Sequence, residues 1–310
     1  MHNTAVLVNE FGKVGLDHHL LRQVNEHTLL LGNGCACCTR REDLVKTLLE
    51  LLAIDERADI SHMERVVIET SGLADPAPIH FTILTHPVLQ HHFFIDRVIT
   101  VVDAVNGHLH LDRHPEAQKQ VASADKIIIT KSDMALVASV DELTSRLHTL
   151  NPLAHIMKAT FGEVNTLLLF SRNEMSTSAE EKNLSKLQNK PLDKKQHISN
   201  THSISLIFQE PLDWRAFGLW LSMLLYARGE DVLRVKGLLD IGEEGPVVLN
   251  GVQHIIHPLE HLDQWPSEDH CSRLIFITRG IDPQVILTSL RIFHHAFAAE
   301  LTQFEVNVHM

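Results

Sequence analysis

The chain has 310 residues, which is enough for two ordinary domains and a large core. Its 39 acidic residues outnumber its 27 Lys and Arg, and the net charge of −12 argues against a nucleic-acid binder, which needs a basic face. With 44% hydrophobic residues, no apolar run long enough to span a membrane and no secretory signal at its start, the sequence predicts a globular cytoplasmic protein.

Strand-like and helix-like stretches alternate over the first 170 residues. Short runs rich in Val and Ile predict parallel strands that are buried on both faces, at 4–9, 65–70, 97–103 and 125–130. Leucines at helical spacing predict helices at 41–55 and 141–152. This alternation is typical of an α/β domain with a mostly parallel sheet, which we assign to residues 1–170.

A polar linker and a second, smaller α+β domain are predicted after residue 170. Residues 171–200 are rich in Ser, Asn, Lys and Glu and poor in apolar side chains, which is typical of a linker. We assign residues 201–300 to the second domain. Its predicted elements are a strand at 201–208, a helix at 212–229 with Asp213 as N-cap and Gly229 as its end, strands at 231–241, 245–250, 252–258 and 272–280, and a helix at 282–300.

Three of the four cysteines lie within the segment "GNGCACCTRRED" at 32–43. In a reducing compartment, the thiolates of Cys35, Cys37 and Cys38 are metal ligands or redox groups more often than disulfide partners. Three thiolates leave a tetrahedral Zn²⁺ one ligand short, so a carboxylate, a histidine, water or a partner protein would complete the site. Buried core cysteines and a redox pair are the alternatives, but the flanking glycines and arginines favour a metal-binding loop. Cys271 is far along the chain, and we expect it to be isolated.

The segment "ETSGLADP" at 69–76 follows the predicted strand at 65–70. An acid at the end of an apolar strand is the usual place for a Mg²⁺-associated carboxylate in nucleotide hydrolases, and Glu69 has that place. Gly72 would bring its backbone N–H against a terminal phosphate, where a side chain would obstruct the approach. The alternative is an ordinary turn closed by Asp75 and Pro76.

The segment "TKSD", residues Thr130, Lys131, Ser132 and Asp133, follows the predicted strand at 125–130 and resembles the guanine-reading [NT]KxD motif of GTPases. The Asp133 carboxylate would accept both N–H groups on the guanine edge, which adenine does not offer. The stem of Lys131 would lie over the base. An earlier loop, "NEFGKVGLD" at 9–17, carries Glu10 and Asp17 and is either a segment that responds to the nucleotide or a surface turn.

These four motifs, in this order, resemble the CobW-like metallochaperone GTPases. The second domain also resembles the CobW C-terminal domain, through "DVLRVKGLLDI", "GVQHIIHP" and "SRLIFITRG". The resemblance implies a P-loop-NTPase-like fold and a GTPase that carries Zn²⁺ on its CxCC motif and delivers it to a client metalloprotein. GTP and Mg²⁺ are expected only in a form that has the phosphate loop, and a homo-oligomer is left open. By position, the resemblance implies metal binding at Cys35, Cys37 and Cys38, catalytic roles for Glu69 and Gly72, and base recognition by residues 130–133.

The sequence departs from this family in two ways. No GxxGxGK[ST] phosphate loop is present, and the chain is expected to start at the second strand of the fold, without the first strand, the phosphate loop and the first helix. We interpret this as a fragment or a start codon placed too late; for the chain as given, we expect severely reduced GTP affinity, almost no hydrolysis and a marginally stable fold. Lys13 stands where the family often has an acid, which weakens any metal role for that loop, including Glu10.

Two alternatives remain open at this stage. The first is a metal-binding protein that does not hydrolyse nucleotide and uses the histidines at 254, 257, 261 and 270, although these are also typical of a solvated loop. The second is a GTPase of the same kind that inserts cobalt or iron, because three thiolates favour Zn²⁺ without excluding other metals. A thioredoxin-like redox function would need CxxC at a helix start, which CxCC in a glycine-flanked loop does not supply.

Overall fold

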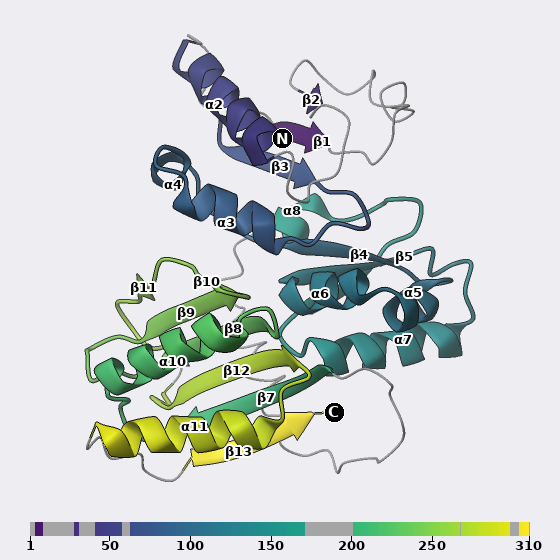
Figure 1. The fold of residues 1–310 in the computed structure, drawn as a ribbon. Coiled ribbons are helices and arrows are strands. Elements are labelled where there is room, and N and C mark those ends of the chain that lie inside the picture. The colour runs from purple at the N-terminus through teal and green to yellow at the C-terminus, as the bar shows by residue number, and fades with distance from the viewer. Residues whose placement is uncertain are drawn as a thin grey trace. The chain divides into compact units, whose positions relative to one another are not determined.

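A computed structural model describes residues 4–8, 28–30, 41–57, 63–170, 201–266, 268–297 and 304–309 (Figure 1). The chain divides into two compact units, Met1–Asp96 and Arg97–Met310. The 9–17 loop, the cysteine motif at 35–38 and the predicted linker at 171–200 lie outside the described residues. The second unit contains both the later half of the α/β region and the C-terminal region.

The first unit contains a three-stranded parallel sheet in the order β2-β1-β3. Its strands are β1 (Thr4–Val8), β2 (Thr28–Leu30) and β3 (Arg65–Glu69), and its helices are α2 (Arg41–Arg57), α3 (Ala77–Thr85) and α4 (Leu89–His92). The leucine spacing that predicted a helix at 41–55 buries Leu44, Leu48 and Leu51 in one cluster with Leu7 of β1. The strands predicted at 4–9 and 65–70 are confirmed.

The second unit begins with another parallel sheet, in the order β4-β5-β6. Its strands are β4 (Ile99–Asp103), β5 (Lys126–Thr130) and β6 (His155–Lys158), and its helices are α5 (Gly107–Arg113), α6 (Pro115–Ser123), α7 (Val137–Leu150) and α8 (Thr166–Phe170). The isoleucines of β5 are buried on both faces, as predicted for a parallel strand. Among the described residues β3 pairs only with β1 and β4 only with β5, so the predicted strands fall into two sheets.

The C-terminal part of the second unit is an antiparallel sheet in the order β10-β9-β8-β12-β7-β13, and β11 also pairs with β9. Its strands are β7 (Thr201–Phe208), β8 (Val232–Leu239), β9 (Val247–Val252), β10 (Ile255–Ile256), β11 (Glu260–His261), β12 (Ser272–Arg279) and β13 (Phe304–His309). Helices α10 (Trp214–Arg228) and α11 (Pro283–Ala296) lie on one face of the sheet (Figure 1). Between them, Trp220 packs edge-on against Phe276 at a ring distance of 5.8 Å and donates a hydrogen bond to Ser289 Oγ.

Several predicted boundaries in this region need correction. The segment 252–258 is not one strand: β9 ends at Val252, the chain turns at Gln253 with φ 53°, and only Ile255 and Ile256 pair back onto β9. The sheet also includes β13, past the predicted boundary at residue 300. Asp213 is the N-cap of α10 as predicted, since its carboxylate accepts the N–H groups of Arg215 and Ala216.

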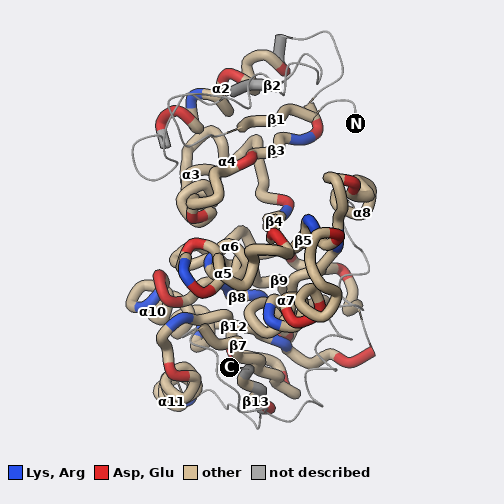
Figure 2. Tube along the Cα trace, turned by 90° about the vertical axis from the view of Figure 1, so that its right-hand side faces the viewer, with Lys and Arg blue, Asp and Glu red and all other residues tan. Residues whose placement is uncertain are grey.

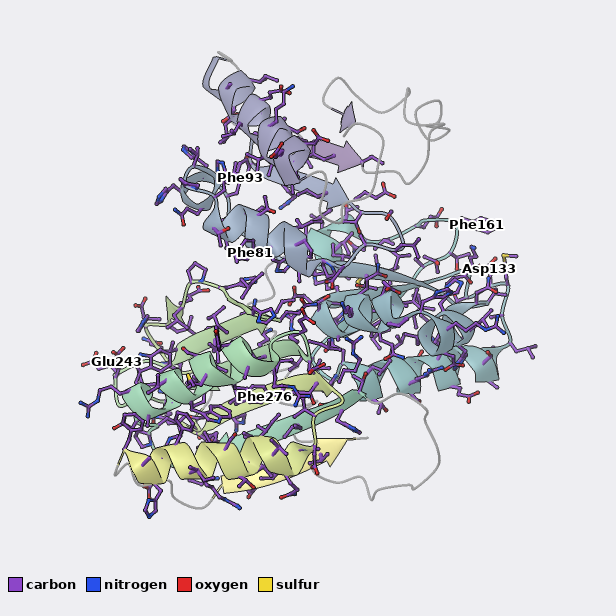
Figure 3. All side chains as sticks on the ribbon, in the orientation of Figure 1. Phe81, Phe93, Asp133, Phe161, Glu243 and Phe276 are labelled. Atoms are coloured by element: carbon purple, nitrogen blue, oxygen red, sulfur yellow. The ribbon has the colours of Figure 1, made fainter. Side chains whose placement is uncertain are left out.

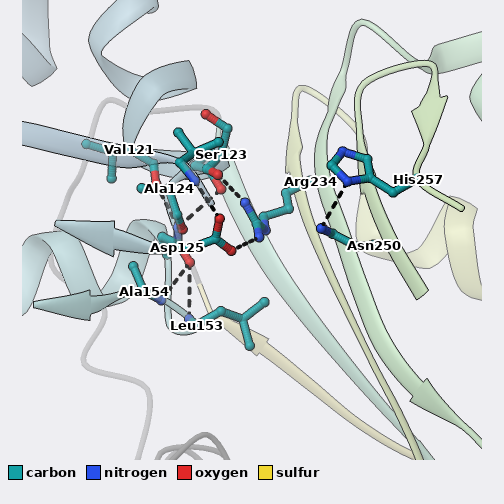
Figure 4. Close-up of polar contacts among 12 residues, drawn as sticks. Val121, Ser123, Ala124, Asp125, Leu153, Ala154, Arg234, Asn250 and His257 are labelled. Atoms are coloured by element: carbon teal, nitrogen blue, oxygen red, sulfur yellow. Dashed lines mark hydrogen bonds and ion pairs between the residues drawn. The ribbon is translucent and has the colours of Figure 1, made fainter. Parts of the chain in front are cut away.

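The carbonyl groups at the end of α6 accept hydrogen bonds from two side chains that are far away in the sequence (Figure 4). Asn151, which is fully buried, donates from Nδ2 to the carbonyls of Val121 (2.7 Å), Ala122 (3.2 Å) and Ala124 (2.8 Å). Its Oδ1 accepts the N–H groups of residues 153 and 154, both at 3.1 Å. The last carbonyls of a helix lack the usual partner within the helix. The Val121 carbonyl also accepts the Ala124 N–H at 3.2 Å, and Asn151 supplies a side-chain donor to all three carbonyls.

An ion pair joins the antiparallel sheet to the parallel sheet of the same unit (Figure 4). Arg234 of β8 is 2% exposed, and its guanidinium donates to Asp125 Oδ1 and to the carbonyl of Ser123. Asp125 directly precedes β5 and accepts the Val98 N–H at 2.8 Å. Burial alone would raise the pKa of the Asp125 carboxyl, but the charges of Arg234 and Lys236 and these hydrogen bonds outweigh burial and hold it below its usual value.

His257 lies near the same ion pair. Burial, together with the positive charge of Arg234, lowers the pKa of His257 to about 4, although Asp125 opposes the shift. The imidazole is therefore neutral in the folded protein, and it lies 3.5 Å from the Asn250 side-chain nitrogen.

We expect the stability of the protein to fall on acidification between about pH 6.5 and pH 4. In this window the unfolded chain protonates His257 and the folded protein does not, so each proton bound favours unfolding. The full contribution of His257 is present above its unfolded pKa and is on the order of 3 kcal/mol. In urea denaturation at a series of pH values, the free energy of unfolding should fall less steeply on acidification for His257→Gln than for the wild type. Equal pH slopes for His257→Gln and the wild type would contradict the prediction.

No helix among the described residues is long and apolar enough to cross a membrane. Helices α2, α5, α6 and α7 each carry both basic and acidic residues, and no continuous basic stripe is visible along the described trace (Figure 2). The charge distribution therefore gives no support to a nucleic-acid interface in this part of the chain.

Candidate functional site

Three loops meet at the carboxyl edge of the sheet formed by β4, β5 and β6. The strands are parallel, with Asp103 opposite Thr130 and Ile129 opposite Lys158, so the segments that follow them leave the sheet at the same edge. The Ala104 N–H donates to the Thr130 carbonyl at 2.9 Å, which ties the first loop to the second. Ligands of open α/β sheets bind at this edge, so the structure gives residues 130–133 the location that the sequence predicted.

Lys131 has an unusual backbone conformation. Its φ of 55° lies in the left-handed region, which costs a non-glycine residue free energy, and its carbonyl accepts the Met134 N–H at 3.0 Å. Its ammonium group donates to Asp103 Oδ2 at 2.6 Å. The sequence analysis did not single out Asp103: it also ends a predicted strand, at 97–103, but the segment that follows it matches none of the motifs considered.

The Asp103 carboxylate is fixed by its own loop. Its Oδ1 accepts the N–H groups of Val105 (2.7 Å) and Asn106 (3.2 Å). Burial would raise the pKa of Asp103, but the hydrogen bond and charge of Lys131 and the two backbone N–H groups together lower it. Asp103 is therefore a carboxylate at neutral pH, and it holds the Lys131 ammonium beside the loop.

Asp133 is exposed, and its carboxylate accepts no hydrogen bond from the residues that the structure describes. It lies at the same end of the sheet as Phe161 of the loop after β6 (Figure 3). Phe161 is 92% exposed and has φ 54°, and Gly162 follows with φ 75°. The sequence analysis missed this loop; the signal available was a glycine shortly after the short strand β6, which ends at Lys158.

Glu69 and Gly72 belong to the first unit. Glu69 ends β3 opposite Val8 of β1, and its side chain is exposed. A Cβ placed on Gly72 would meet no atom within 4 Å, so the described protein does not itself require glycine there. Asp75 Oδ1 accepts the Ala77 N–H at 3.0 Å just before α3, whose N-cap residue is Pro76.

The predicted metal ligands Cys35, Cys37 and Cys38 lie outside the described residues. Within the described ranges no group of three or more His, Cys, Asp or Glu side chains is arranged to hold a metal ion. Cys271 donates to Gln209 Oε1 at 3.1 Å, and burial together with Asp269 raises the pKa of its thiol to about 11, so it is protonated at neutral pH. A protonated thiol is a poor metal ligand.

The four histidines proposed above as alternative metal ligands do not converge on one point, and each has a partner of its own. His254 Nδ1 lies 2.9 Å from the Leu225 carbonyl, and His257 contacts Asn250. His261 lies 3.0 Å from a Glu243 carboxylate oxygen, and His270 stacks on Trp265 at a ring distance of 5.0 Å. The geometry gives no support to a histidine metal site in this region.

Two family models match the chain. The model for the CobW/HypB/UreG nucleotide-binding domain matches residues 1–158, which is slightly more than half of the chain. The chain belongs to the CobW/HypB/UreG family. The model for the cobalamin synthesis protein CobW C-terminal domain matches residues 201–293, so the CobW resemblance also extends over the second domain.

The known relatives of this CobW-family chain include zinc proteins. The zinc chaperone YjiA of Escherichia coli K12 is 34% identical over 282 residues, which cover 89% of this chain and 85% of YjiA. The zinc-regulated GTPase metalloprotein activator 1 of Schizosaccharomyces pombe is 25% identical, and the match covers 91% of this chain and 74% of that protein. The crystal structure of Zn(II)-bound YjiA GTPase superposes with a TM-score of 0.66 at 24% identity, over 94% of this chain and 98% of YjiA, which confirms the predicted α/β fold with a second, smaller domain.

Proposed function

We propose that this protein is a zinc chaperone that carries Zn²⁺ on Cys35, Cys37 and Cys38 and delivers it to a client metalloprotein under the control of GTP. The observation that carries the nucleotide part is the carboxyl edge of the β4-β5-β6 sheet, where Lys131 is held by Asp103 and the Asp133 carboxylate is exposed. Membership of the CobW family and its zinc-chaperone relatives support the choice of metal.

The proposed base recognition uses the two charged residues of the "TKSD" segment. Asp133 accepts the ring N–H and the exocyclic N–H of guanine, which adenine does not present together. The methylene stem of Lys131 covers one face of the base while its ammonium remains on Asp103. Thr130 and Ser132 complete the segment between the strand and the base.

The proposed phosphate recognition uses Glu69 and Gly72. The Glu69 side chain is exposed and accepts no hydrogen bond from the described residues, so its carboxylate is available to Mg²⁺, which prefers oxygen ligands. A Cβ placed on Gly72 would meet no described atom within 4 Å, so a phosphate oxygen could approach the backbone more closely there than at a residue with a side chain. Bound Mg²⁺ would neutralise charge on the phosphates during hydrolysis. Because the 310 residues contain no GxxGxGK[ST] loop, we expect weak phosphate binding by this chain.

The proposed zinc transfer depends on thiolates in a reducing compartment, so we expect the protein to act in the cytoplasm. Binding of the metal requires deprotonated cysteines, and a three-thiolate set leaves one position for a ligand of the client protein. This proposal includes control of the transfer by GTP and delivery of the zinc ion to a client protein.

Zinc titration tests the proposal directly. The wild-type chain should bind one Zn²⁺ tightly, and Cys37→Ser should lose this stoichiometric binding because a neutral hydroxyl replaces a thiolate. Cys271→Ser is the matched control, since the thiol of Cys271 has a raised pKa and lies outside the motif, and it should bind zinc like the wild type. The site assignment fails if Cys37→Ser binds Zn²⁺ with unchanged stoichiometry and affinity. Competition with Co²⁺ and Fe²⁺ in the same assay tests whether the site prefers cobalt or iron to zinc.

A metal-binding protein that does not use nucleotide is the second candidate. The absence of the GxxGxGK[ST] loop from the 310 residues favours it. The two candidates differ in one property, because only a GTPase-derived site should prefer guanine to adenine. Guanine-selective nucleoside binding by this chain would argue against the second candidate.

A further inference from the structure

The Lys131 side chain is the most adjustable part of the proposed base-binding site. A lysine stem has four rotatable bonds, so a lysine that is free in solvent must be ordered when a base binds under it. Lys131 is 54% exposed, yet its ammonium is held 2.6 Å from Asp103 Oδ2. The conformational cost of ordering the stem is therefore met before the base arrives.

The Asp103 carboxylate is itself well fixed. It is 17% exposed and accepts two backbone N–H groups on Oδ1, which leaves Oδ2 for Lys131. Asn106 Nδ2 is also 3.5 Å from Oδ2. The acid and the lysine are 28 residues apart, but the parallel pairing of β4 with β5 puts Asp103 directly opposite Thr130, the residue before Lys131.

The backbone of Lys131 also directs its side chain. A left-handed conformation at a non-glycine residue persists only where the surrounding structure holds it, and such residues cluster at ligand sites. Here the Met134 N–H on the Lys131 carbonyl and the Ala104 N–H on the Thr130 carbonyl hold the segment on both sides.

From this geometry we propose that Asp103 is a positioning residue that holds the Lys131 stem in place for a guanine base and thereby contributes to guanine selectivity. This inference rests on the proposed nucleotide function. Asp103 acts through Lys131 and does not touch the base, so its effect must disappear when the lysine is removed. The lowered pKa of Asp103 agrees with a permanent negative charge at this position.

A double-mutant cycle with guanosine as the probe tests the proposal on the chain as it exists. Guanosine has no phosphate, so its binding reports the base site alone, and adenosine is the selectivity control. Affinities are measured by NMR titration of the labelled wild type, Asp103→Asn, Lys131→Met and the double variant. Asp141→Asn is the matched control, since it removes the partner of another lysine, Lys158, in an exposed pair of the same unit.

The proposal predicts that Asp103→Asn weakens guanosine binding by about two- to fivefold, as expected for one ion pair whose lysine is exposed to solvent. The double variant should bind guanosine like Lys131→Met alone, and Asp141→Asn should bind like the wild type. An equal loss from Asp103→Asn in both lysine backgrounds, or tighter binding by Asp103→Asn, would overturn the positioning role while leaving the proposed nucleotide function intact. If the wild type does not prefer guanosine to adenosine, the nucleotide function itself fails, and the positioning role fails with it.

Discussion

Replacing Arg234 by methionine is expected to lower the free energy of unfolding of the second unit by about 3 kcal/mol, at the lower end of the range for a broken buried ion pair. Methionine fills much of the same volume but leaves Asp125 without its cation and the Ser123 carbonyl without its guanidinium donor. The Asp125 side chain is 26% exposed, and water can therefore reach it and limit the loss. Urea denaturation at pH 7, with the slope checked for two-state behaviour, measures the effect.

Two further variants separate the ion pair from general packing. Arg228→Met is the matched control, because Arg228 pairs with Asp231 at 2.8 Å in an exposed position where such pairs contribute less than about 1 kcal/mol. Asp125→Leu combined with Arg234→Met removes both charges and should recover part of the lost stability. If Arg234→Met and Arg228→Met cost the same, the proposed role of the buried pair is wrong.

Replacing Asn151 by alanine is expected to cost about 3 kcal/mol of stability. The substitution removes the side-chain donor from three carbonyls at the end of α6 and the side-chain acceptor from the N–H groups of residues 153 and 154, which are buried or half-buried. The Val121 carbonyl keeps the Ala124 N–H and the Ala154 N–H keeps the backbone carbonyl of residue 151, so the loss falls mainly on the other three groups. Each buried polar group left without a partner costs about 1–3 kcal/mol, although water entering the new cavity offsets part of the sum. Thermal and urea denaturation of the purified variant measure the loss.

The chain offers a matched asparagine as the control. Asn165 also accepts two backbone N–H groups, from Leu167 and Leu168, but it is near the exposed start of α8. Asn165→Ala should cost about 1 kcal/mol, the usual effect of losing a helix cap. Asn151→Asp separates the two roles of the side chain. It retains the Oδ1 acceptor but replaces the Nδ2 donor with a second oxygen, which faces the α6 carbonyls. Equal losses for the two alanine variants would show that the buried position of Asn151 has no special effect.

The strands and the longer helices could be predicted from local pattern. Continuous Val and Ile runs are compatible with a strand that is buried on both faces, and β5 has the predicted bounds within one residue. Helix α7 begins at Val137, before its predicted start at residue 141, because the first turn lacks the leucine spacing that marks the rest of the helix. Strand β13 was missed because its apolar residues alternate over a short segment and its stabilising partner, β7, is about 100 residues away.

The candidate site was predicted in part. The motif order identified residues 130–133, and the structure gives them the expected edge of the sheet, whereas Asp103 and the loop at Phe161 were not anticipated. Glu69 and Gly72 retain their predicted roles as proposals, and so do the three motif cysteines, which lie outside the described residues.

The sequence by itself determined the family and the alternation of strands and helices, and it supplied the residues proposed to bind zinc and to read guanine, because these depend on residue type and short spacing. The tertiary structure alone decided which charges meet. With 39 acidic and 27 basic residues, the sequence allows very many pairs, and nothing local distinguishes Lys131 with Asp103 or Arg234 with Asp125. Strand register and sheet packing choose those pairs, because they bring together residues that are 28 and 109 positions apart in the chain.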